Sequence, residues 1–233
     1  PAGPGPERGI PEPKAPKGRR LVIVDKPART QTQIFIGGLG MHPFDTDYEA
    51  LVVGNTIFGG TFTARLTKEV RSKRGWSYGA SSRLGRDRAR DAWAMWTFPA
   101  ARDAAACIAL QLKLFEQLLD EGVTDREVSF VKSYLLRSHA FDIDTASKRM
   151  WLGLDEAVAE LPRGYHAGFV DRVQQVTRDE VNAALRRRLS RDNLWVCVSA
   201  TASELRADLE KAIPRLRETL IVPFDADLLP QPR

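Results

Sequence analysis

The sequence predicts an α+β fold in which helices cover one face of a mostly antiparallel sheet. Two observations carry this prediction. Short apolar or alternating segments typical of strands occur early, in the middle and late in the 233-residue chain, and longer segments with apolar residues at helical spacing lie among them. Their order is strand, strand, helix, helix, strand, strand, several helices, strand, helix, which is typical of an α+β domain.

Strand composition recurs along the chain. Leu21 to Asp25 is a short apolar run, and Gln31 to Gly40 alternates before it reaches Gly37-Gly38. Glycines at this point allow another chain to approach closely. Asp91 to Phe98 has the same character, and a late apolar strand is predicted at Asn193 to Ala200.

Helical spacing of apolar residues marks the longer segments. Asp45 is expected to cap a helix that continues through Phe58. Arg102 to Leu119 is a strongly apolar helix, and Asp144 to Glu160 is also helical. The apolar face of the Arg102 to Leu119 helix consists of Ile108, Leu112, Phe115 and Leu119.

Capping sequences predict where further helices begin. In a capping box a threonine hydroxyl accepts the N–H of the residue three positions on, and the glutamate at that position accepts the N–H of the threonine. The chain contains Thr124-x-x-Glu127, Thr177-x-x-Glu180 and Thr201-x-x-Glu204. Each box predicts a helix that begins just after its threonine.

The segment from Gly59 to Ser82 is the most informative part of the sequence. Phe62 to Lys73 is predicted to be a helix with cations crowded into its last turn, where they suit the negative end of the helix dipole, and Gly75 is expected to stop it. From Trp76 the pattern changes to an alternating strand with Trp76 and Tyr78 on the same face. A helix-to-strand turn would then separate Tyr78 from an arginine seven residues earlier, Arg71.

These residues resemble a known family. The matching positions are Gly59-Gly60, Ala64-Arg65-Leu66, Arg71, Arg74-Gly75 and Tyr78-Gly79. They resemble the carboxy-terminal, non-metal-binding domain of the pitrilysin and insulinase type of zinc peptidase, which is also found in mitochondrial processing peptidase and in the core proteins of the cytochrome bc1 complex. The resemblance runs from about Leu21 to Ile213 and is specific between Gln31 and Ser82. It implies the same α+β fold.

The resemblance implies that Arg71 and Tyr78 bind substrate. In related enzymes the matching pair reaches across a chamber toward the zinc domain and hydrogen-bonds the peptide backbone near the bond to be cleaved. A guanidinium or a phenol suits this role because a fixed donor stabilises negative charge that develops on a carbonyl oxygen. The alternative is structural: Arg71 would cap a helix carbonyl, and Tyr78 would fill an aromatic pair between strands.

The sequence predicts no metal site. The family carries zinc in a different domain, on a His-x-x-Glu-His motif with a further glutamate downstream. The histidines of this chain are His42, His139 and His166, and no two of them have helical ligand spacing. We expect His42 in a loop, His139 near a helix end and His166 on a helix surface. Zinc is expected in a partner domain.

Two functions from different classes follow. In the first, the chain is the carboxy-terminal or partner domain of a zinc metallopeptidase, inactive alone, which contributes Arg71 and Tyr78 to a composite peptide-binding site. Its partner would be the zinc-bearing domain, in the same chain or in a separate subunit, in a dimer or a domain-paired assembly. In the second, the chain is a non-catalytic scaffold or assembly domain of the same fold.

The family also suggests a second way to bind peptide. Its enzymes bind substrate as an added strand at a sheet edge, mainly in the zinc domain. Because Gln31 to Gly40 alternates and carries glycines at its end, we expect it to form an exposed edge of this kind.

Composition bounds the domain organisation. Residues 1–20 are expected to form a flexible proline-rich linker, or an untidy terminus, because their composition buries no apolar surface; residues 21–233 would form the peptidase-family domain. The sequence has no apolar run of membrane-spanning length and no signal-like amino end. Because the chain starts at proline, we expect it to be a fragment of a longer protein. The compartment stays open.

Cysteines and charge add little. Cys107 and Cys197 are expected to be small core residues, with a disulfide left open. The formal charge of +5 and the run Arg186-Arg187-Arg188 invite a nucleic-acid interpretation, but no recognition signature accompanies them. An acidic peptide or an acidic partner surface is the expected counterpart of this charge, and no nucleic-acid partner is expected.

Overall fold

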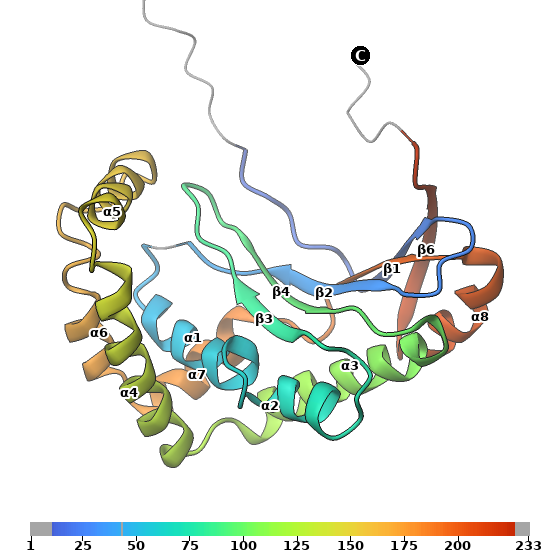
Figure 1. The fold of residues 1–233 in the computed structure, drawn as a ribbon, viewed down its shortest axis with the longest axis horizontal. Coiled ribbons are helices and arrows are strands. Elements are labelled where there is room, and N and C mark those ends of the chain that lie inside the picture. Colours follow the sequence, from blue (N-terminus) through green and yellow to red (C-terminus); the bar gives the residue numbers. More distant parts are fainter. Residues whose placement is uncertain (1–10, 43, 227–233) are drawn as a thin grey trace, which may run out of the picture.

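A single sheet organises the fold, and most of the helices lie on one side of it (Figure 1). The computed structural model describes residues 11–42 and 44–226. Within this part the strands are β1 (Arg19–Asp25), β2 (Gln33–Leu39), β3 (Ala80–Leu84), β4 (Ala92–Thr97), β5 (Trp195–Ala200) and β6 (Leu216–Pro223). Their order across the sheet is β3-β4-β2-β5-β1-β6.

The sheet is mixed but mostly antiparallel. Across the described residues, three of its five strand pairings are antiparallel, and β1 runs parallel to both β5 and β6. The predicted α+β class, with helices on one face of a mostly antiparallel sheet, is therefore confirmed.

The helices differ widely in length, from three residues to 18 residues. The α-helices are α1 (Tyr48–Asn55), α2 (Arg65–Thr67), α3 (Ala104–Glu121), α4 (Asp125–Asp142), α5 (Ala146–Val158), α6 (Phe169–Gln175), α7 (Arg178–Arg188) and α8 (Ala202–Ala212). Wide π-helical turns extend α1 over Thr56–Gly60 and α2 over Lys68–Ser72, and a short 3₁₀ turn at Ala101–Asp103 leads into α3.

The capping predictions are right for two helices. The Thr124 and Thr177 boxes both form, with each threonine hydroxyl accepting from the glutamate N–H and each glutamate side chain bonding back. The Thr201 box is wrong, although α8 begins at the next residue. The Thr201 hydroxyl instead donates to the Lys26 carbonyl and accepts from the Arg29 N–H, because the loop after β1 lies against it.

The cap predicted for the first helix is also wrong. Asp47 is the residue before α1, and it makes no side-chain cap bond. Asp45 accepts instead from the His42 N–H at 3.0 Å. Both carboxylates pair with the Arg188 guanidinium of α7, and the Arg187 side chain lies 3.1 Å from Asp47. Ion pairing within the fold therefore takes up two members of the arginine run.

The expected sheet edge at Gln31 to Gly40 is wrong. β2 lies inside the sheet, paired with β4 on one side and β5 on the other, so that its backbone groups are used within the sheet. A Cβ atom at Gly37 would lie 2.1 Å from the Trp93 carbonyl oxygen. Close approach does occur at this glycine, but to the neighbouring strand β4 rather than to a substrate.

Side chains from α1 and α2 bond to β3, one of the two edge strands of the described sheet. The Thr67 hydroxyl donates to the Ala80 carbonyl at 2.6 Å, and the Asn55 amide donates to the Ser82 carbonyl at 3.3 Å. These bonds occupy carbonyl groups of β3 that would otherwise point outward, so this edge is poorly suited to adding a strand.

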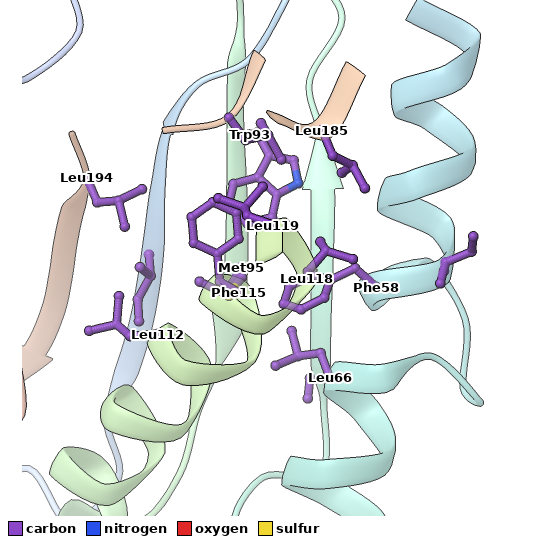
Figure 2. Close-up of a cluster of buried hydrophobic side chains, with 14 of the residues drawn as sticks. Phe58, Leu66, Trp93, Met95, Leu112, Phe115, Leu118, Leu119, Leu185 and Leu194 are labelled. Atoms are coloured by element: carbon purple, nitrogen blue, oxygen red, sulfur yellow. The ribbon is translucent and has the colours of Figure 1, made fainter. Parts of the chain in front are cut away.

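An aromatic cluster fills the space between the sheet and α3 (Figure 2). The ring centroids of Trp93 and Phe115 lie 4.7 Å apart, and the Phe58 ring lies 6.0 Å from that of Trp93. The Trp93 N–H donates to the Asn55 side chain at 2.9 Å, and the Ser82 hydroxyl bonds to the same oxygen at 2.7 Å. This buried network joins α1 to β3 and β4. The predicted apolar face of α3 is buried here, at Ile108, Leu112, Phe115 and Leu119.

The other face of the sheet carries no helix in the described part of the chain (Figure 1). Phe35 is 48% exposed there and stacks on Trp96. The segment that precedes β1 approaches this face, since Pro16 is buried and lines a hollow with Phe35 and Trp195. Residues 1–10 of the predicted linker lie outside the described residues.

Two elements were not predicted, α6 and β6. α6 has seven residues, too few for a clear helical period, and β6 is an edge strand whose charged and apolar residues do not alternate. Both cysteines are free thiols. Cys107 is buried, and Cys197 is only partly buried.

Candidate substrate-binding site

The helix that carries Arg71 is short and ends where the sequence predicts. It begins at Arg65 rather than at Phe62, and its second half is the wide turn Lys68–Ser72. Gly75 closes it with a φ of +64°, a conformation that favours glycine. The Gly75 N–H bonds to the Arg71 carbonyl at 3.0 Å, and the chain then turns toward β3.

The strand predicted from Trp76 onward begins later. Trp76 to Gly79 form a loop, and β3 starts at Ala80. The Ser77 hydroxyl accepts from the Phe98 N–H at 2.9 Å, which replaces a strand-to-strand bond by a side-chain bond. A Cβ atom at position 79 would lie 2.7 Å from the Phe98 ring, so glycine is needed there.

Because of this loop, Trp76 and Tyr78 do not share a strand face. Trp76 is half-buried and packs against the core. Tyr78 points outward, with 76% of its side chain exposed. The prediction that both rings lie on one face is wrong, because a loop that is held by a side-chain bond does not keep the two-residue alternation of a strand.

The structure brings Arg71 and Tyr78 together. The Arg71 guanidinium lies over the Tyr78 ring, 4.4 Å from its centroid, and 5.3 Å from the centroid of Phe62. Phe62 is 78% exposed, so the guanidinium lies between two exposed rings. Sequence reasoning missed Phe62 as a member of this cluster because it placed that residue inside the helix.

Arg71 differs from the two cations beside it. Lys73 and Arg74 both pair with Glu69, at 2.5 and 2.8 Å. The Lys73 hydrogen bond, followed by that of Arg74, lowers the pKa of the Glu69 carboxyl. No hydrogen bond or ion pair joins the Arg71 guanidinium to any residue among those described. Its donors therefore face solvent, held in place by the rings.

The histidines lie apart from this cluster. The His42 ring bonds to the Arg88 carbonyl, and the His139 ring packs against Phe169 within α4 and α6. His166 lies in the turn before α6 rather than on a helix surface. It is 6% exposed and bonds to Asp155 of α5 at 2.8 Å. The surface position predicted for it is wrong, because the turn folds back under α5.

The described residues offer no fit for zinc. No group of three or more histidine, cysteine, aspartate or glutamate side chains is placed to hold a metal ion within residues 11–42 and 44–226. The same part of the chain contains no helix long and apolar enough to cross a membrane.

The fold and the cluster define an α+β domain with an exposed arginine–aromatic cluster, and comparison with known proteins gives its family. The model of the peptidase M16 inactive domain matches residues 1–135. An uncharacterized zinc protease of Mycobacterium tuberculosis is 31% identical over 181 residues, which are 74% of this chain and 39% of that protein. The crystal structure of a peptidase M16 inactive domain from Pseudomonas fluorescens has a TM-score of 0.72 at 30% identity, covering 82% of this chain and 45% of that one.

The chain therefore belongs to the peptidase M16 inactive-domain family, and the predicted resemblance to pitrilysin and insulinase type zinc peptidases is confirmed. It spans about two fifths of the length of the mycobacterial relatives that it matches. A further relative, described as a non-peptidase homologue in Helicobacter pylori, is 21% identical over 126 residues, 54% of this chain and 29% of that protein.

Proposed function

We propose that this chain is the carboxy-terminal or partner domain of a zinc metallopeptidase, and that it contributes Arg71 and Tyr78 to a composite site for the peptide substrate. The observation that carries the proposal is the arrangement of Arg71, whose guanidinium is unpaired among the described residues and stacked on an exposed tyrosine ring. By contrast, Arg65 and Arg188, which join elements of the fold, each form an ion pair with a carboxylate.

The two side chains offer donors of complementary kinds. The planar guanidinium of Arg71 presents several N–H groups in a fixed fork, and the Tyr78 hydroxyl donates one O–H. Both suit a peptide carbonyl oxygen, which gains negative charge when the carbonyl carbon is attacked. A donor that is already in place stabilises that charge without reorganising, and losing one such donor typically costs about 3 to 4 kcal/mol of transition-state binding.

The packing of the cluster supports a fixed orientation. The guanidinium lies over Tyr78 and close to Phe62, and Tyr78 belongs to a loop that the Ser77 bonds hold. Cation–π contacts of this kind are worth about 0.5 to 1 kcal/mol at exposed sites, enough to favour one orientation of a long side chain.

Zinc would lie on a partner domain. The described residues do not fit the metal, and relatives named zinc proteases are more than twice as long as the matched part of this chain. The zinc-bearing domain would be in the same chain or in a second subunit, and the role of the present domain is to hold and polarise the peptide. The unpaired Arg71 suits a peptide or a partner surface with acidic character.

A scaffold role is the second candidate. It is favoured by the Helicobacter pylori relative, which is described as a non-peptidase homologue, so that similar proteins are not all described as peptidases. A scaffold needs no donor aimed at substrate, so this candidate forecasts that changes at Arg71 and Tyr78 leave activity and assembly unaltered.

Conservative variants of the assembled enzyme test the proposal. Arg71→Lys keeps the charge and loses the fork, and Tyr78→Phe removes only a hydroxyl. Each is expected to lower kcat/KM by about tenfold or more, with Tm nearly unchanged, because both side chains are exposed or half-exposed. Arg102→Lys, at a side chain that is 86% exposed and distant in sequence, is the matched control. Folded variants with full activity would refute the substrate role.

A further inference from the structure

Helix α4 has apolar residues on two faces, and only one face is packed against the domain. Val128 and Val131 lie in the core. Around the helix, at spacings of four and seven residues, Phe130, Tyr134 and Phe141 are exposed to 57%, 42% and 69%. Burying an aromatic side chain contributes about 1.5 to 3 kcal/mol of favourable free energy. A row of exposed rings on one helix face is therefore typical of a surface that binds a ligand or a partner.

The first two of these rings form one wall of a groove that also contains Tyr78. The groove has a volume of about 520 Å³. A second hollow of about 750 Å³ continues along α4 toward Phe141 and shares Phe130 and Tyr134 with the first. We call the two together the aromatic groove. Its aromatic lining consists of Phe62, Tyr78, Trp96, Phe130, Tyr134 and Phe141.

The charges along the aromatic groove have one sign. Among the described residues that line it, none is a carboxylate, and Arg137 is the only charged side chain. Arg137 is exposed and has no ion-pair partner within the described part of the chain. Arg71 lies over Tyr78 at the opposite end. The groove is thus apolar along its middle and has a cation toward each end.

We propose that the aromatic groove binds apolar side chains of the peptide segment that adjoins the bond held by Arg71 and Tyr78, and that Arg137 pairs with an acidic residue further along the same segment. The proposal rests on the function proposed above and adds the class of peptide. An extended peptide is the occupant that the geometry favours, because the two hollows share Phe130 and Tyr134 and so form one continuous surface that reaches Tyr78.

Binding of labelled peptides tests this inference without requiring turnover. The protein is the assembled peptidase, treated with chelator, and the readout is the Kd from fluorescence anisotropy. The first pair of peptides consists of an apolar peptide, with Phe and Leu in the segment that would lie in the groove, and a polar peptide, with Ser and Asn at the same positions. The second pair consists of two peptides that differ only at the outer end of this segment, where one has Asp and the other has Lys. The variants are Phe130→Ser and Arg137→Glu. Phe224→Ser is the matched control, since Phe224 is 53% exposed and lies outside the groove.

Phe130→Ser is expected to weaken binding of the apolar peptide about tenfold or more and to leave the polar peptide nearly unaffected. Arg137→Glu is expected to invert the preference between Asp and Lys. The control should change neither. The inference is overturned if Phe130→Ser alters both peptides alike or neither, or if Arg137→Glu keeps the original preference.

These outcomes are separable from the fate of the proposed function. If Phe130→Ser and Arg137→Glu shift the peptide preference while Arg71→Lys and Tyr78→Phe keep full kcat/KM, then peptide binding in the aromatic groove is supported and the substrate role of Arg71 and Tyr78 is refuted. Loss of kcat/KM in those variants with no shift at Phe130 or Arg137 would do the reverse.

Discussion

Arg71 is one of three cations at the end of a short helix, and its pairing distinguishes it from the other two. Lys73 and Arg74 both form ion pairs with Glu69, whereas Arg71 has no such partner among the described residues. The sequence alone could place Arg71 near Tyr78, since a glycine-terminated helix brings the following residues back. It could not show that Phe62 joins them, because this depends on where the helix begins.

At the same scale, two glycines with opposite surroundings give a matched test of the packing. A Cβ atom at Gly37 would meet the Trp93 carbonyl oxygen, whereas one at Gly153 in α5 would meet no described atom within 4 Å. Gly37→Ala is expected to lower the free energy of unfolding by about 1 to 3 kcal/mol or more, because strand backbone must shift. Gly153→Ala should raise it by about 0.5 to 1 kcal/mol. Urea unfolding of the two variants measures both; equal effects would contradict the strand register.

Among the elements, those specified by local sequence were predicted well. The two capping boxes and the apolar face of α3 depend on residues within one helix, so the sequence suffices to predict them. The late start of β3 and the central position of β2 depend on bonds to residues far along the chain, such as that between Ser77 and Phe98. Sequence periodicity contains no information on such partners, which is why the edge predicted at β2 was wrong.

The start of α4 predicts a pH dependence. Burial raises the pKa of Glu127, but the hydrogen bonds from Arg65 and from Thr124 more than offset this, so that the pKa lies below its ordinary value of 4.5. A carboxyl whose pKa is lowered in the folded state stabilises the fold fully above its unfolded pKa and loses that contribution as the pH falls through the folded value. We expect stability to decrease below about pH 4.5, and less steeply in Glu127→Gln. Urea unfolding curves at several pH values measure the free energy of unfolding of both proteins. Equal slopes of this free energy against pH in the unaltered protein and in Glu127→Gln would contradict the prediction.

Thr124→Ala tests the same cap at neutral pH. The hydroxyl accepts from the Glu127 N–H and is bonded to the Glu127 carboxylate. Its removal should cost about 1 kcal/mol of unfolding free energy. Thr201→Ala is the comparison, because that hydroxyl closes a loop instead of a helix.

At the scale of the whole molecule, the described residues form a domain with one core, and its sheet has one face covered by helices and one face on which these residues place none (Figure 1). We predict that the purified chain binds no stoichiometric zinc and cleaves no peptide, because His42, His139 and His166 do not have the spacing of the family's zinc motif. Metal analysis together with a peptidase assay checks this. Stoichiometric zinc accompanied by chelator-sensitive cleavage would contradict it.

The central claim is that Arg71 and Tyr78 act together on the substrate and not on stability. A double-mutant cycle in the assembled peptidase tests it most directly, with kcat/KM and Tm measured on the same preparations of Arg71→Lys, Tyr78→Phe and the double variant. If both donors serve one developing charge, the double variant should lose less kcat/KM than the sum of the single losses, expressed as free energies, while Tm stays nearly unchanged. A folded double variant with full activity would contradict the claim, as would variants that melt early but cleave normally.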